Sequence, residues 1–206
     1  GIYKNKIKAI TREYSTNAFD AHLEAGITEP FEVHLPTVRE SYFYVRDFGL
    51  GLDEDQFENV FFKFFESTKD QSNVYNGTMG LGSKSFASYH TKSCTVESIK
   101  NGKKFIYAAY IGQTGCPERS LLYSSDTDEP SGLKVQIPVD PDDINEFINN
   151  AEEVYKWFSI KPKFVGHQLD FDESLIYKEK TDNYAITTSR GIYAVMSNVA
   201  YPIELH

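Results

Sequence analysis

The sequence predicts an α/β (α+β) fold, a two-layer sandwich in which helices cover one face of a mixed, mainly antiparallel sheet. Apolar residues recur at helical spacing near the N-terminus and again after residue 140. Short runs rich in β-branched and aromatic residues lie between these two helical segments. The chain has 206 residues, which is enough for one full hydrophobic core.

The first helix is expected over residues 2–23. Ile7, Ile10 and Tyr14 recur at the spacing of one helical face. Gly26 follows the last periodic residues, and glycine commonly stands just beyond the end of a helix. Further helices are predicted at 55–65, 81–90 and 142–158.

Local signals mark the start of the last helix and the limits of the strands. Asp140 is placed to cap the helix that follows it, and Pro141 suits the first helical turn. The β-type runs are short and are separated by glycine, proline and polar residues. The predicted strands are 31–35, 42–45, 92–99, 104–111, 119–124, 132–139, 169–177 and 191–196.

Composition narrows the class of protein. The net charge is −9, and such an acidic chain is a poor candidate for a broad nucleic-acid-binding surface, which must neutralise phosphates. Cys94 and Cys116 stand in unlike contexts, so we expect reduced thiols of a cytoplasmic protein. No apolar run approaches the length of a membrane-spanning helix.

Three stretches carry residues that suggest a ligand site. The first helix places carboxylates and an amide on one face, a strand ends in an acid-glycine turn, and a glycine-rich segment leads into a helix. Alone, each has an ordinary reading as a solvated stripe, a tight turn or loop punctuation. The residues are Glu13, Asn17 and Asp20 in the first stretch, Asp47, Gly49 and Gly51 in the second, and Gly77, Gly80, Leu81, Gly82, Ser83 and Lys84 in the third.

Together, the order and spacing of these stretches resemble the GHKL ATPases, the superfamily of the gyrase B subunit, MutL, MORC proteins and sensor histidine kinases. The resemblance covers residues 4–139 and implies a Bergerat-type ATP-binding fold. Residues 1–140 are therefore expected to form the ATP-binding domain. Residues 141–206 would add a helix and strands that continue it or lead into a following domain.

A closer likeness is to the N-terminal region of the rIIA-type lysis-inhibition and exclusion proteins of tailed phages. It rests on "YKNKIKAITREYSTNAFDAH", "VRDFGLGL", "FFESTKDQSN" and "GLGSKSFASY". This likeness implies a bacteriophage origin, a place in the cytoplasm of the infected bacterium, and a further region beyond His206.

The resemblance assigns roles to the polar face of the first helix. Asn17 would give its amide oxygen to a Mg²⁺ ion that bridges the nucleotide phosphates, since this cation needs few protein oxygens. Glu13, one turn earlier, would act as the general base on the attacking water. Asp20 would orient neighbouring groups in the nucleotide site.

The second stretch would recognise the base. Asp47 would accept a hydrogen bond from the adenine amine, whereas guanine presents a carbonyl oxygen at that place. Gly49 and Gly51 would let the backbone pass close to the base. One departure concerns Leu133, which follows Gly132 where many relatives have a threonine near the adenine site.

The third stretch would hold the phosphates. Its glycines would present backbone N–H groups at the start of a helix, and Lys84 would pair with the β- or γ-phosphate. Residues 66–79 would form a mobile lid over the nucleotide. The remaining expected contacts in this stretch come from Gly77, Gly80, Leu81, Gly82 and Ser83.

The expected function is Mg²⁺-dependent ATP binding and slow hydrolysis, used as a conformational switch on host or prophage processes. Expected partners are an adenine nucleotide and either a second copy of the chain or a phage or host protein. The alternative is a non-hydrolysing nucleotide-binding or protein-interaction module. Glu13 favours hydrolysis, because a pure binding protein needs no base there. A histidine kinase ranks last, because the chain has no phospho-accepting helix upstream of the first stretch.

Overall fold

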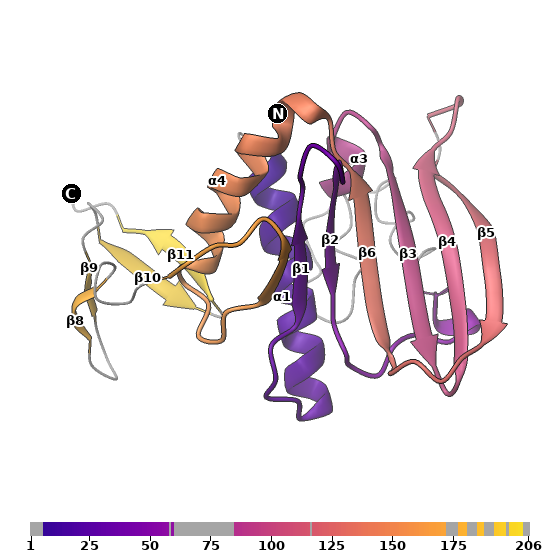
Figure 1. Cartoon of the computed structure of the whole chain (residues 1–206), viewed down its shortest axis with the longest axis horizontal. Helices are drawn as coiled ribbons and strands as arrows, with labels where there is room; N and C mark the ends of the chain where they lie inside the picture. Colours follow the sequence, from indigo (N-terminus) through magenta and orange to yellow (C-terminus); the bar gives the residue numbers. More distant parts are fainter. Residues whose placement is uncertain are drawn as a thin grey trace.

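The largest part of the described structure is a seven-stranded sheet (Figure 1). The computed structural model describes residues 6–57, 59, 85–115, 117–171, 177–180, 185–187, 192–196 and 198–203. The helices are α1 (Lys6–Ala25), α3 (Ser85–Ser88), the short 3₁₀ helix η1 (Pro141–Asp143) and α4 (Ile144–Tyr155). The strands are β1 (Glu32–Leu35), β2 (Tyr42–Arg46), β3 (Ser93–Lys100), β4 (Lys103–Ile111), β5 (Pro117–Asp126), β6 (Gly132–Pro138), β7 (Lys163–Gly166), β8 (Tyr177–Lys180), β9 (Ala185–Thr187), β10 (Tyr193–Met196) and β11 (Val199–Pro202).

Within the described residues, seven strands pair in the order β5-β4-β3-β6-β2-β1-β7. Neighbours in this sheet are antiparallel except β1 and β7, which run parallel. Strands β2 and β6 lie at the centre, with Val45 opposite Val135. Two separate hairpins, β8–β9 and β10–β11, follow β7. The predicted fold class, a mixed and mainly antiparallel sheet with helices, is confirmed.

The helices cover one face of this sheet. Figure 1 shows α1 crossing behind β1 and β2, and α1 contacts both α4 and α3. Alternate strand residues point into this layer, because side chains of a strand alternate between its two faces. The fully buried ones include Val33, Phe43, Val96 and Ile137, and α1 presents Ile10 to them.

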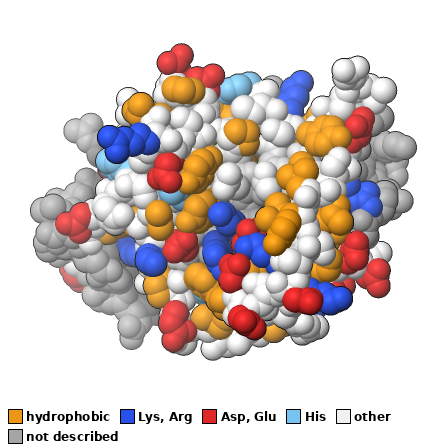
Figure 2. Space-filling model, turned by 45° about the vertical axis from the view of Figure 1, so that its right-hand side comes forward, with side chains coloured by type: hydrophobic (Ala, Val, Ile, Leu, Met, Phe, Trp, Pro, Cys, Tyr) orange, Lys and Arg blue, Asp and Glu red, His pale blue; other side chains and the backbone are white. Residues whose placement is uncertain are grey.

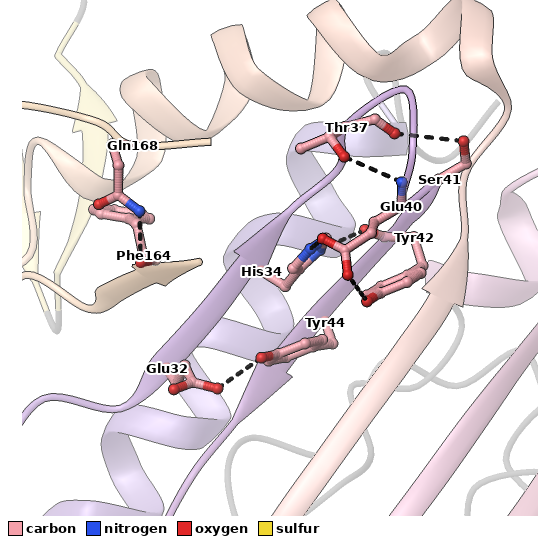
Figure 3. Close-up of polar contacts among 9 residues, drawn as sticks. All are labelled: Glu32, His34, Thr37, Glu40, Ser41, Tyr42, Tyr44, Phe164 and Gln168. Carbon is pink, nitrogen blue, oxygen red and sulfur yellow. Dashed lines mark hydrogen bonds and ion pairs between the residues drawn. The ribbon is translucent and has the colours of Figure 1, made fainter. Parts of the chain in front are cut away.

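The opposite face of the sheet carries aromatic side chains over β1 and β2, and Figure 2 shows hydrophobic and charged side chains intermingled on one side of the molecule. Over β1 and β2, the rings of His34, Tyr42 and Tyr44 stack with centroids 4.3 to 6.3 Å apart. The Tyr44 hydroxyl donates to Glu32 at 2.6 Å, and Glu40 accepts from Tyr42 at 2.8 Å (Figure 3). These side chains tie β1 to β2 on the face that lies away from the helices.

A hydrogen bond inside the core joins α1 to α4. The Ser15 hydroxyl lies 2.7 Å from the Tyr155 hydroxyl, and both residues are fully buried. Ser15 also donates to the carbonyl of Thr11 at 2.6 Å, so Tyr155 donates to Ser15. This contact and the apolar residues of α1 in the core hold α1 against α4.

The expected elements agree with the structure over the sheet and differ at the edges. Strands expected between residues 31 and 139 are present within a few residues, and Asp140 caps η1 by accepting from the N–H of Asp142 at 3.0 Å. Of the strand expected at 169–177, residues 169–171 are not a strand, 172–176 lie outside the described residues and Tyr177 begins β8, whereas β7 at 163–166 was not predicted. The helix expected to run to residue 90 ends at Ser88.

Parts of the predicted helices at 2–23, 55–65 and 81–90 fall outside the described residues. Near the second of these, residues 54–57 are described and are helical. The expected domain boundary near residue 140 stays a prediction, while α4 and β7 extend the helical layer and the sheet that precede it. No described helix has both the length and the apolarity needed to cross a bilayer.

We expect Tyr155→Phe to lower the free energy of unfolding by about 1 kcal/mol, because it removes one buried hydrogen bond and little volume. Urea unfolding measures the difference. Tyr123→Phe is the matched control, since Tyr123 is 51% exposed and lies on β5, at the edge of the sheet. It should change stability by less than about 0.5 kcal/mol. Equal changes in the two variants would contradict the α1–α4 contact.

Candidate functional site

A pocket lies between α1 and the central strands β2 and β6. It holds about 280 Å³ of space free of protein atoms, part of which is open to solvent. Most of its wall is apolar, and two polar side chains, Asn17 and Asp47, reach it from opposite sides of the layer. The other lining residues are Tyr14, Ala18, Val45, Leu133 and Val135.

Asp47 directly follows β2 and is 7% exposed. Its Oδ1 atom accepts hydrogen bonds from the N–H of Gly49 at 2.9 Å and of Leu133 at 3.2 Å. The Asp47 N–H donates to the Leu133 carbonyl at 2.9 Å, so β6 holds both the backbone and the side chain of Asp47. Both of these side-chain bonds end on Oδ1, which leaves Oδ2 as the acceptor available to a ligand.

Burial raises the pKa of Asp47 above its usual range, because a charged carboxylate loses hydration in the pocket. The backbone N–H groups of Gly49 and Leu133 act in the opposite direction and favour the carboxylate. The expected departure at Leu133 leaves these contacts intact, because the N–H and the carbonyl that bond Asp47 are backbone atoms, which any residue except proline supplies.

Two glycines allow this close packing. Gly132 has a φ of +146°, and a Cβ there would collide with the carbonyl oxygen of Asp47. Gly51 has a φ of +64°, and a Cβ there would collide with the carbonyl oxygen of Ile99. Both positions require glycine because backbone packs directly against backbone. The proposed passage of Gly49 and Gly51 close to a base stays a prediction.

The polar face of α1 reaches the pocket through one side chain. Asn17 lines the pocket, and Glu13 lies one turn earlier on the same helix, half-buried and with its Oε2 atom shielded from solvent. Glu13 is not among the residues that line the pocket, and Asp20 is exposed beyond it. The structure thus brings Asn17 and Asp47 together across one cavity, and places Glu13 beside it.

The third stretch of the sequence lies outside the residues that the structure describes. The expected lid, residues 66–79, lies outside the described part of the chain, and so does the glycine-rich segment that follows it. The expected contacts outside the described residues are those of Gly77, Gly80, Leu81, Gly82, Ser83 and Lys84.

One residue beside the site went unrecognised in the sequence. His22, on the last turn of α1, accepts the Phe48 N–H at 2.8 Å, one residue from Asp47. A histidine with no other metal-ligating residue at metal-site spacing is expected to be structural or to lie on the surface. The available signal was its position on the helix, four residues after Ala18 and on the same buried side.

A family of known ATPases matches more than half of the chain. The family is described as histidine kinase-, DNA gyrase B- and HSP90-like ATPases, and it matches residues 5–122. The chain is also similar to the B subunit of type 2 DNA topoisomerase 6 from Methanothermobacter thermautotrophicus, with 26% identity over 157 residues. That match takes in 74% of this chain and 26% of the relative, so the chain spans about a quarter of its length.

Two solved structures share the fold at 16% identity. The ATPase region of Saccharomyces cerevisiae topoisomerase II bound to ICRF-187 (dexrazoxane) gives a TM-score of 0.61, covering 94% of this chain and 62% of that one. The ATPase region of the same topoisomerase in a second crystal structure gives 0.54, covering 76% and 47%. At this identity the likeness concerns the fold.

We expect Gly51→Ala to destabilise the fold far more than Gly26→Ala. The two glycines have nearly equal φ, +64° and +68°, but a Cβ at Gly26 meets nothing within 4 Å. Gly26→Ala should cost about 1 kcal/mol, the strain of a left-handed alanine. Gly51→Ala should cost at least about 3 kcal/mol, since backbone must also move. Equal losses in urea unfolding would contradict the packing of Gly51 on β3.

Proposed function

Because the chain belongs to the family of histidine kinase-, DNA gyrase B- and HSP90-like ATPases, we propose that it binds ATP in the pocket between α1 and strands β2 and β6. The observation that carries this proposal is the Asp47 carboxylate. It is buried, its Oδ1 is occupied by two backbone N–H groups, and its Oδ2 remains beside an otherwise apolar wall. The faces of an adenine ring would pack against the apolar walls, and its exocyclic amine would donate a hydrogen bond to Asp47 Oδ2.

The same geometry supports selection of adenine over guanine. The exocyclic amine of adenine donates a hydrogen bond, and a carboxylate oxygen can only accept one. Guanine would set a carbonyl oxygen against Asp47 and leave two acceptors facing each other in a buried place. The backbone bonds to Oδ1 hold the carboxylate in one orientation before the nucleotide arrives, which lowers the cost of ordering it.

Asn17 fits the role of a Mg²⁺ ligand. Its side chain reaches the same pocket from α1, and an amide oxygen is a suitable ligand for a hard cation that keeps most of its waters. Bound Mg²⁺ would supply positive charge that neutralises the nucleotide phosphates. The Asn17 amide would then align the phosphates with α1, so that they point toward Glu13 and away from Asp47.

Hydrolysis is proposed to depend on Glu13. Its half-buried carboxylate stands one helical turn from Asn17 and can hold a water molecule and take its proton. Asp20, exposed further along α1, would act on neighbouring groups and not on the nucleotide itself. A wild-type chain that binds ATP without turning it over would leave the alternative function, a nucleotide-binding module that does not hydrolyse.

We further propose that the chain is related to the rIIA-type phage proteins and works as a slow ATP-driven switch on host or prophage processes, in the cytoplasm of an infected bacterium. The four sequence segments quoted above support this kinship. A second copy of the chain or a phage or host protein would read the switch. The similar topoisomerase chains are much longer than this one, so their reactions on DNA are no part of the proposal.

The first test is a calorimetric titration with Mg²⁺ and either ATP or GTP. We expect the wild type to prefer ATP, and Asp47→Asn to raise the dissociation constant for ATP by about 10- to 100-fold, because a hydrogen bond to a charged group is lost. Asp55→Asn, at an exposed position, is the control. An unchanged affinity in Asp47→Asn, or equal wild-type affinities for ATP and GTP, would contradict adenine recognition by Asp47.

Stability should separate lost binding from lost folding in Asp47→Asn. Burial raises the folded-state pKa of Asp47, so the stability that this group contributes is present at low pH and is lost as pH rises through that pKa. Asparagine stays neutral, and it can accept the same two N–H groups. The variant should therefore be at least as stable as the wild type at pH 7.

The second test is steady-state ATP turnover in Glu13→Gln. We expect the rate to fall by about 10²- to 10⁴-fold, the usual value of a general base, with Mg·ATP affinity nearly unchanged. Glu24→Gln is the matched control, since Glu24 is an exposed glutamate on the same helix. Equal turnover in the wild type and Glu13→Gln would rule out hydrolysis through Glu13.

A further inference from the structure

His22 is held in one chemical form by its two hydrogen bonds. Its Nε2 lies 2.8 Å from the backbone nitrogen of Phe48, and an N–H can only donate. Its Nδ1 lies 3.0 Å from the carbonyl oxygen of Glu29, which can only accept. The neutral ring with its proton on Nδ1 satisfies both, whereas a doubly protonated ring would set N–H against N–H at Phe48.

The ring is also fixed in place. His22 is 4% exposed and packs edge-on against Phe31, with ring centroids 6.2 Å apart. The ring of Phe48 lies at 6.0 Å. Since α1 is itself held by the core, His22 transmits the position of this helix to the turn that follows β2.

That turn carries the adenine-recognising carboxylate. The N–H of Phe48 points to His22, and the next N–H, of Gly49, donates to Asp47 Oδ1 at 2.9 Å. Two successive peptide groups are therefore oriented, one by α1 and one by the carboxylate. Release of the first peptide would free the second to rotate, and Asp47 would lose one of the two bonds that aim Oδ2 at the pocket.

We propose that His22 is a positioning residue for nucleotide selection: its neutral ring, proton on Nδ1, sets the turn that aims Asp47 at the adenine amine. This proposal rests on the proposed function. It assigns to α1 a second task besides presenting Asn17 and Glu13, because the same helix then controls both the phosphate side and the base side of the pocket.

The experiment compares affinities for ATP and for inosine triphosphate, which has a carbonyl oxygen in place of the adenine amine. We expect His22→Leu to reduce the preference for ATP at least about 10-fold, the value of one well-made hydrogen bond. His22→Gln should restore most of it, since the glutamine oxygen can accept the Phe48 N–H. His34→Leu is the matched control: His34 is also buried but lies on the far face of the sheet, so this variant should keep the preference.

A merely structural role predicts a different pattern. If His22→Leu weakens both nucleotides equally, or if His22→Gln rescues nothing, His22 does not act through Asp47 and the proposal is overturned. The double variant His22→Leu with Asp47→Asn should prefer ATP over inosine triphosphate as strongly as Asp47→Asn alone does. A further loss of this preference in the double variant would also overturn the proposal that His22 acts through Asp47.

A nucleotide-free measurement separates this proposal from the function on which it rests. The Asp47 carboxyl can be followed by NMR as a function of pH. We expect His22→Leu to raise the pKa of Asp47 further, because it removes the electrostatic effect by which the His22 ring lowers this pKa and also weakens the Gly49 hydrogen bond to the carboxylate, and His34→Leu to leave it unchanged. A wild type that binds no ATP would contradict the proposed function. An unchanged Asp47 titration in His22→Leu would overturn the role of His22 independently.

Discussion

The double attachment of Asp47 to β6 is the constraint on which the pocket depends. One carboxylate oxygen and one backbone N–H of Asp47 both bond Leu133, so the end of β2 and the start of β6 cannot move apart without exposing a buried acid. Gly132 must be a glycine for the two backbones to approach this closely. Burying the Asp47 carboxylate is unfavourable for folding. Because its Oδ2 atom remains available to a ligand, we connect this burial to function.

Helix α1 serves both the hydrophobic core and the pocket beside Asp47. Helix α1 is anchored to α4 through Ser15 and Tyr155, and it faces the sheet with apolar residues on one side. The adjoining side carries Asn17 and Glu13. On the opposite face of the sheet, the rings of His34, Tyr42 and Tyr44 stack, and Glu40 bonds His34 and Tyr42 (Figure 3). The pocket lined by Asn17 and Asp47 lies on the helical side.

Much of this arrangement could be predicted because the signals are local. Helical periodicity in α1, the Asp140 cap and the alternating strands depend on neighbouring residues. β7 was missed because it has four residues and is defined by parallel pairing with β1, far away in the sequence. In the site, Asn17 and Asp47 stand in recognisable patterns. The roles of His22 and of the Leu133 backbone depend on contacts across 26 and 86 positions, which no local pattern reveals.

A nucleotide site beside Asp47 can be tested by mapping NMR chemical shifts on adding Mg²⁺ and an ATP analogue that is not hydrolysed. We expect the amide signals of Gly49 and Leu133, whose N–H groups hold Asp47 Oδ1, to shift together with the side-chain amide of Asn17. His34 and Tyr42, on the far face of the sheet, should not respond. Shifts confined to the far face, or none at saturating nucleotide, would contradict a nucleotide site between α1 and strands β2 and β6.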